Sequence, residues 1–205
     1  MSIVKLNNRG VRSVTAFGSL TSGSMTFIKK LTASSSSTLS FVDGSSDVVL
    51  DNTYKEYLFT FKDIHPATDG TTFHFQGSTD GGSNYNTTMT TTYFRARHNE
   101  SDSVAQVGYD TSTDQAQGTS YQPLAYNVEA DNDQCCSGTL QLFNPSSTTF
   151  SKHYISRFNN YGSSNYSRDE YSAGYFNTTS AINGVSFKFA SGNIDSGQIL
   201  LFGLN

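Results

Sequence analysis

The sequence predicts an all-β fold: a two-sheet antiparallel sandwich of jelly-roll type with a short N-terminal arm. The composition is the first reason, because the 205 residues include 31 Ser, 24 Thr and 16 Asn, and 13% are Phe or Tyr. Such residues favour strands and turns over helices. The second reason is that alternating segments recur roughly every ten residues between turn signals. No Pro/Gly-rich linker divides the chain, so we assign residues 1–20 to the arm and residues 21–205 to the sandwich domain.

The clearest strand signals lie between residues 54 and 77. Residues 54–64 alternate and place Tyr57, Phe59 and Phe61 on one face, and residues 71–77 alternate in the same way. A turn signal with Pro66 and Gly70 separates them. We therefore expect these two segments to pair as a β-hairpin, after earlier strands at residues 25–31 and 38–42.

A second turn follows at residues 78–85. Its sequence, STDGGSNY, has the form of the Asp-box hairpin that recurs in sialidase-like propellers, but it occurs here once. The carboxylate of Asp80 is expected to cap backbone N–H groups, while Gly81 and Gly82 supply left-handed positions. We interpret this segment as a stable turn that leads into a Thr-rich strand at residues 87–97.

Residues 99–133 form the longest stretch without apolar periodicity, with a short helix conceivable at residues 114–117. Long loops of this kind are usually functional. Strands are expected again at residues 137–143, 150–159, 171–176, 185–190 and 198–204. The last contains Ile199–Phe202, which is apolar on both faces and predicts a central, fully buried strand.

Charge and motif content argue against several functional classes. The net charge is −4 and no dense run of Lys or Arg is present, so nucleic-acid binding is not expected. Apolar runs fall far short of the ~20 residues that span a bilayer, so membrane insertion is not expected either. The four histidines have no metal-site spacing, and adjacent Cys135 and Cys136 are interpreted as free thiols. We assign no catalytic, cofactor-binding or metal-binding residue and expect no cofactor.

Two acidic segments are the only candidates for glycoside cleavage, which needs two carboxyl groups facing one bond. They are His98–Asn99–Glu100 and Asp169–Glu170. Solvated loop carboxylates are the simpler interpretation, so the chain is expected not to be an enzyme.

Tyrosines interleaved with Ser, Asn and Gln suggest a binding surface, because flat rings give contact area at small entropic cost. Packing at the edge of the sandwich is the alternative. The candidate partner-binding or glycan-binding residues are Tyr109, Tyr121, Tyr126, Tyr161, Tyr166 and Tyr171.

Five segments also carry a resemblance to a known family. They are residues 3–11 (IVKLNNRGV), residues 51–78 with YKEYLFTFKDIHPATDG, residues 93–100, residues 137–153 with LFNPSSTTFSKH, and AGYFNTTSAINGVSFKFASGNIDSG from Ala173. Together they resemble a family of short jelly-roll-like virion structural proteins from tailed phages of marine bacteria, including cyanophages. The resemblance covers nearly the whole chain, implies a multi-copy component of a phage particle, and implies no catalytic site.

We therefore expect a non-enzymatic protein on the exterior of a tailed-phage virion, as a capsid decoration or a tail or fibre appendage. It would be made in the host cytoplasm, bind other virion proteins and self-associate, with a trimer as the leading expectation. A carbohydrate-binding module that recognises the host surface is the alternative, and a polysaccharide-degrading enzyme comes third. The arm is expected to dock through basic and apolar side chains, although a flexible leader is the simpler interpretation; its candidate residues are Ile3, Lys5, Leu6, Arg9, Val11 and Arg12.

Overall fold

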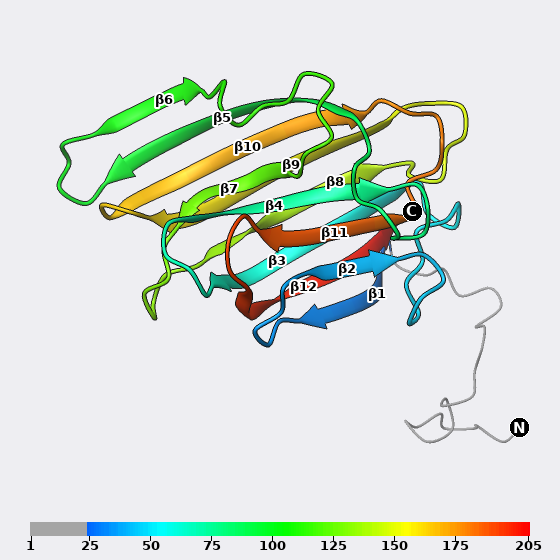
Figure 1. The fold of residues 1–205 in the computed structure, drawn as a ribbon, viewed down its shortest axis with the longest axis horizontal. Helices are drawn as coiled ribbons and strands as arrows, with labels where there is room; N and C mark the ends of the chain where they lie inside the picture. The colour runs from blue at the N-terminus through cyan, green and yellow to red at the C-terminus, as the bar shows by residue number, and fades with distance from the viewer. Residues whose placement is uncertain (1–23) are drawn as a thin grey trace, which may run out of the picture.

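The computed structural model describes residues 24–205, which form twelve β-strands and contain no helix (Figure 1). The arm residues named above lie outside the described residues. The strands are β1 (Met25–Thr32), β2 (Leu39–Val42), β3 (Glu56–Pro66), β4 (Thr71–Ser78), β5 (Met89–Asn99), β6 (Ala105–Tyr109), β7 (Gln122–Val128), β8 (Cys136–Phe143), β9 (Lys152–Gly162), β10 (Tyr166–Phe176), β11 (Gly184–Phe189) and β12 (Ile194–Leu204). The predicted all-β class is thereby confirmed.

All pairings between these strands are antiparallel, and the sheet curls until it is nearly closed into a barrel. The path runs β1-β12-β3-β8-β9-β7-β4-β11-β2. At one seam β9 meets β7 through a single pair, Gly162 and Val128. At the other seam an isolated bridge joins Ser36, just before β2, to Ile194 of β12.

A branch leaves this closed part at β9. Strand β10 pairs with β9 along its whole length, β5 pairs with β10, and β6 pairs with β5. The four strands therefore continue the sheet beyond the closed part, and β6 forms the end of the branch (Figure 1).

The core is a cluster of phenylalanines between opposite arcs of the curled sheet. Phe61 of β3 lies 4.9 Å from Phe187 of β11 and 4.8 Å from Phe158 of β9, between ring centroids. Phe73 and Phe75 of β4 also contact Phe187. The alternation seen in the sequence thus directs one aromatic face of each strand into a shared interior.

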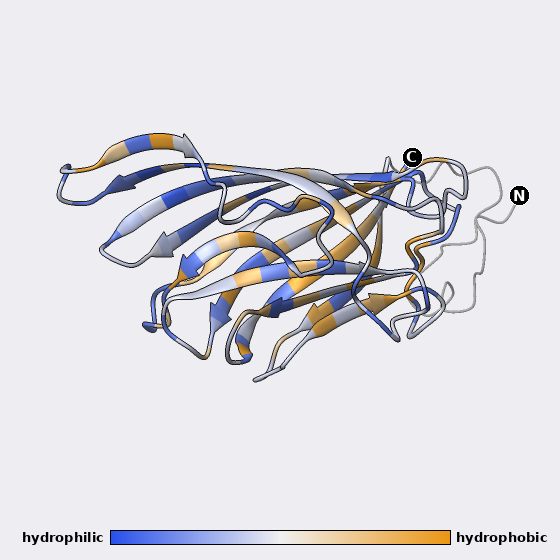
Figure 2. Cartoon of the chain, turned by 45° about the horizontal axis from the view of Figure 1, so that its top comes forward, coloured by the Kyte–Doolittle hydropathy of each residue, from blue (hydrophilic) through white to orange (hydrophobic). Residues whose placement is uncertain are grey.

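The branch has a different character from the closed part. Along β10 the inward positions change from Phe176 to Ser172, Glu170 and Arg168, all of them buried. In Figure 2, β5 and β10 are accordingly more hydrophilic than the strands around the aromatic core. The part of the branch around Glu170 and Arg168 is therefore held by polar contacts, and the candidate site lies at the end of the branch that these residues approach.

The expected hairpin between residues 54–64 and 71–77 is wrong. Strand β3 pairs with β8 and β12, whereas β4 pairs with β7 and β11. Phe61 and Phe73 face each other across the core, with ring centroids 5.8 Å apart. The turn at residues 67–70 therefore connects two strands on opposite sides of the interior. A short connection can join strands that face each other across a core as readily as strands that pair side by side.

Two further expectations need correction. Residues 99–133 are not one irregular stretch, because they contain β6 and β7, and residues 114–117 are not helical. Strand β12 is central, between β3 and β1, but only one of its faces is fully buried. Its other face is half-exposed, since Phe202 packs against Phe27, which is itself exposed.

The expected turn at residues 78–85 is confirmed. Asp80 Oδ1 accepts hydrogen bonds from Ser78 Oγ at 2.7 Å and from the backbone N–H of Asn84 at 2.9 Å. Gly81 and Gly82 have φ of 70° and 81°. The side-chain amide of Asn84, which donates to Asp80 Oδ2 at 2.7 Å, and then these two donors lower the pKa of Asp80 to about 2. The cap therefore stays charged over the whole physiological range.

Candidate binding site at the ends of β5, β9 and β10

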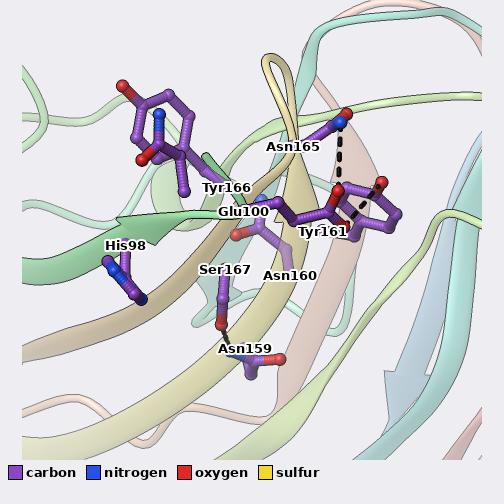
Figure 3. Close-up of a pocket in the computed structure, with 9 residues that line it drawn as sticks. His98, Glu100, Asn159, Asn160, Tyr161, Asn165, Tyr166 and Ser167 are labelled. Carbon is purple, nitrogen blue, oxygen red and sulfur yellow. Dashed lines mark hydrogen bonds between the residues drawn. The ribbon is translucent and has the colours of Figure 1, made fainter. Parts of the chain in front are cut away.

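A polar cavity of about 300 Å³ lies where β5 and β9 end and β10 begins (Figure 3). Tyr166 pairs with both Asn99 and Gly162, which brings the two turns at this end of the branch together. The β9–β10 turn needs left-handed residues, and Ser164 and Asn165 supply them with φ of 62° and 56°. The lining residues are His98, Asn99, Glu100, Asn159, Asn160, Tyr161, Asn165, Tyr166 and Ser167.

The carboxylate of Glu100 is fixed by two donors. Tyr161 Oη donates to Oε1 at 3.3 Å, and Asn165 Nδ2 donates to Oε2 at 3.2 Å (Figure 3). The backbone N–H of Glu100 also donates to the carbonyl of Asn165 at 3.1 Å. Partial desolvation raises the pKa of Tyr161, and the Glu100 charge raises it further, so the hydroxyl remains a donor.

The opposite side of the cavity offers amide and hydroxyl groups. Asn159 Nδ2 donates to Ser167 Oγ at 3.2 Å and to the carbonyl of Arg168 at 2.8 Å. His98 lies on the same face of the sheet as Ser167, its register partner, and its Nε2 is 2.9 Å from Asp102 Oδ1. The cavity lining therefore combines hydroxyl, amide and imidazole groups with the carboxylate of Glu100.

Tyr166 adjoins the cavity, but its ring lies on the opposite face of the sheet from His98 and Ser167, where two guanidinium groups lie against it. Arg97 and Arg168 stand 5.5 Å and 5.3 Å from the ring centroid. Arg168 is itself held by the carbonyl of Asn127, to which Nη1 donates at 2.9 Å. Arg168 thus links the ring of Tyr166 to the seam between β9 and β7.

That seam is closed by side chains that bind backbone groups of β7. The backbone N–H of Tyr126 donates to Glu170 Oε2 at 2.7 Å, and the carbonyl of Tyr126 accepts from Asn160 Nδ2 at 2.9 Å. Burial raises the pKa of Glu170 to about 7, although the Tyr126 N–H donor works in the opposite direction. The Glu170 carboxyl group is therefore buried, and it stabilises the contact between β10 and β7.

The structure does not bring the two acidic segments together as a catalytic pair. Glu100 lies at the cavity, Glu170 is buried against β7, and Asp169 is paired with Arg157 Nη2 at 2.7 Å. Within residues 24–205, no group of three or more His, Cys, Asp or Glu side chains could hold a metal ion. No helix in this part of the chain is long and apolar enough to cross a membrane.

The six candidate tyrosines fall in several places. Tyr161 and Tyr166 line the cavity described above, while Tyr121 and Tyr126 line a hollow of about 500 Å³ between residues 112–121 and β4. Tyr171 stacks on Phe94 at 4.7 Å on the outer face of the branch. Tyr109 lies on β6, more than half exposed, with its hydroxyl bound to Asp114.

Sequence reasoning missed the asparagines and the serine of the cavity. A usable signal was present, since Asn160–Tyr161 and Asn165–Tyr166 flank a short turn. Two Asn–Tyr pairs around such a turn place amides and rings at the same end of a hairpin.

Comparisons of this chain with protein-family models, with curated proteins and with solved structures find no match. The geometry of the cavity must therefore be interpreted by its own chemistry. Its lining contains one carboxylate and neither lysine nor arginine. A carboxylate, several amides and a tyrosine ring suit an uncharged ligand rich in hydroxyl groups.

Proposed function

We propose that this chain is a non-enzymatic structural protein on the exterior of a tailed-phage virion, either a capsid decoration or a tail appendage. In this proposal the β domain is a jelly roll and residues 1–20 attach it to other virion proteins. The proposal rests on the sequence resemblance together with one structural observation, the strand order.

Eight of the strands pair in the order of a jelly roll. With β1, β2, β3, β4, β7, β8, β11 and β12 taken as strands one to eight, the pairing is 1-8-3-6 and 2-7-4-5. The same strand order is found in the two four-stranded sheets of a double Greek key, and this agreement supports the proposed jelly roll. The remaining strands are two insertions, β5–β6 and β9–β10, each an antiparallel hairpin.

The strand order supports the proposal because jelly rolls are common in viral capsid and lectin domains. Fold alone does not establish function, so the virion assignment needs a direct test. A surface rich in Ser, Thr and Asn is also suited to seawater, where salt screens charges within a few ångström.

Incorporation into particles tests the proposal. Antibody against the β domain should label intact virions, and deletion of Ser2–Phe17 should abolish incorporation while the melting temperature of the domain stays nearly unchanged. The domain should keep its stability because the strands of residues 24–205 supply the aromatic cluster around Phe61 and Phe187. Labelling that appears only after particles are disrupted would contradict an exterior position, and normal incorporation of the deletion variant would contradict attachment through the arm.

A carbohydrate-binding module is the second candidate, and the cavity beside Glu100 favours it. Carboxylate oxygens that are already held by Tyr161 and Asn165 can accept hydrogen bonds from adjacent sugar hydroxyls without reorganisation. Hydrogen bonds to a charged group contribute about 1.5 to 3 kcal/mol. Loss of this charge should therefore weaken glycan binding by roughly ten- to a hundredfold.

A glycan array with the wild-type protein and the Glu100→Gln variant tests this second candidate. Asp195→Asn is the matched control, since Asp195 is exposed on β12 and does not line the cavity. Equal binding by the wild type and Glu100→Gln would exclude this cavity as the glycan site. Release of reducing sugar by the wild type would instead indicate an enzyme.

A further inference from the structure

Strand β6 is an edge strand of the sheet that residues 24–205 form. Within residues 24–205 it pairs only with β5, and all five of its residues are exposed. In Figure 1 it forms the outermost strand of the branch, far from the aromatic core. Its outer side therefore presents backbone groups that another strand could bind.

The register with β5 shows which backbone groups face outward. The N–H of Asn99 donates to the carbonyl of Val104, and the N–H of Asp110 donates to the carbonyl of Tyr93. In an antiparallel pair, these bonds bracket the non-hydrogen-bonded pairs His98–Ala105 and Phe94–Tyr109. By alternation, the N–H and C=O groups of Ala105, Val107 and Tyr109 point away from β5.

The other free edges carry protection that β6 lacks. Strand β1 contains Lys29 and Lys30 and has a register shift between Phe27 and Lys29. Strand β2 has only four residues. Charged residues, bulges and shortness are the usual devices that prevent pairing at an edge. Strand β6, with the sequence AQVGY, contains no charge, no proline and no register shift.

Apolar side chains follow the same edge. Val107 is 70% exposed and Tyr109 is 54% exposed. Tyr109 is the register partner of Phe94, which is 43% exposed and stacks on Tyr171. Paired residues share one face, so an apolar strip runs from β10 to the free edge and ends there without a neighbour among the described strands.

We propose that β6 pairs antiparallel with β6 of a second copy of this chain. A two-fold axis at Val107 places Val107 opposite its own copy and Ala105 opposite Tyr109 of the second copy. Ala105, Val107 and Tyr109 of one copy then each lie opposite an outward-facing residue of the other copy, so their N–H and C=O groups face each other. The contact is self-complementary, joins uncharged segments to each other and continues the apolar strip across the axis.

This inference does not depend on the proposed virion function. It concerns a contact between two copies, which closes on a dimer because an isologous contact uses the same patch on both chains. The trimer expected from the sequence would require a different, heterologous contact.

Val107→Pro tests the contact, and Val107→Thr is the matched control. Proline removes the N–H that points outward, but leaves the β5 side of the strand intact, because prolines are tolerated on an edge strand where the N–H faces solvent. Threonine keeps both the N–H and a β-branched shape. We expect the wild type and Val107→Thr to sediment as dimers at micromolar concentration and Val107→Pro as a monomer with an unchanged circular dichroism spectrum.

Hydrogen exchange gives a second measurement that does not depend on a variant. The amide of Val107 should be protected in the wild type and should lose this protection on dilution to monomer. A monomeric or trimeric wild type, a dimeric Val107→Pro, or a Val107 amide that exchanges at the rate of an exposed amide in the dimer would each overturn the proposal.

Discussion

At the scale of single residues, Glu170 combines a buried carboxyl group with a structural task. It holds β10 to the backbone N–H of Tyr126, and burial raises its pKa to about 7. An unfolded chain titrates this group near 4.5, so the folded state binds the proton more tightly. The stabilisation that the folded state gains from this tighter proton binding is therefore complete below about pH 4.5 and is lost as the pH rises through 7.

Glu170→Gln should remove this dependence on pH. Glutamine keeps an acceptor for the Tyr126 N–H and carries no charge to desolvate. The variant should be more stable than the wild type at pH 8, by up to roughly 3 kcal/mol, and nearly equal to it at pH 4.5. Denaturant unfolding at both pH values measures this difference, with Asp195→Asn as an exposed control; a wild-type advantage at pH 8 would show that the ionised form is the stabilising one.

At the scale of elements, β11 contributes the centre of the core through Phe187. Its ring contacts five other phenylalanines, which come from β2, β3 and β4. Strand β11 thus connects the two arcs of the sheet by side-chain packing as well as by its pairing with β2 and β4.

Phe187→Ala should destabilise the domain by about 3 to 5 kcal/mol, because it removes a large ring and leaves a cavity that its neighbours cannot fill. Phe150→Ala, at a side chain that is 68% exposed, should cost less than about 0.5 kcal/mol. Thermal unfolding of both variants measures the contrast. Similar losses would show that the aromatic cluster is not the main source of stability.

The sequence predicts strand positions in this protein better than strand partners. Alternation locates β3 and β4 because it reports which side chains are buried, yet it does not distinguish pairing beside each other from packing across a core. Strand β6 was not predicted, because all its residues are exposed. A strand without a buried face does not show the alternation of apolar and polar residues that locates β3 and β4. The tyrosines of the cavity were identifiable by composition, whereas Asn159, Asn160 and Ser167 depend on the β9–β10 register.

At the scale of the whole molecule, the two modules of the chain have different roles. The closed part holds the aromatic core, and the branch carries the polar cavity and the free edge. Side-chain contacts to the backbone of Tyr126 and Asn127 join them at the seam. Substitutions on the outer branch should therefore alter binding or self-association more than stability.

The position of β12 has a consequence for the timing of biosynthesis. Strand β12 lies between β1 and β3, and Met25 pairs with Leu204. Translation at about 5 to 20 residues per second separates the synthesis of these two residues by roughly 10 to 40 s. The hairpins β5–β6 and β9–β10 join neighbouring segments and can form during that interval. Strands β1 and β3 must wait for their shared neighbour, so the nascent chain completes this sheet only after β12 has been made.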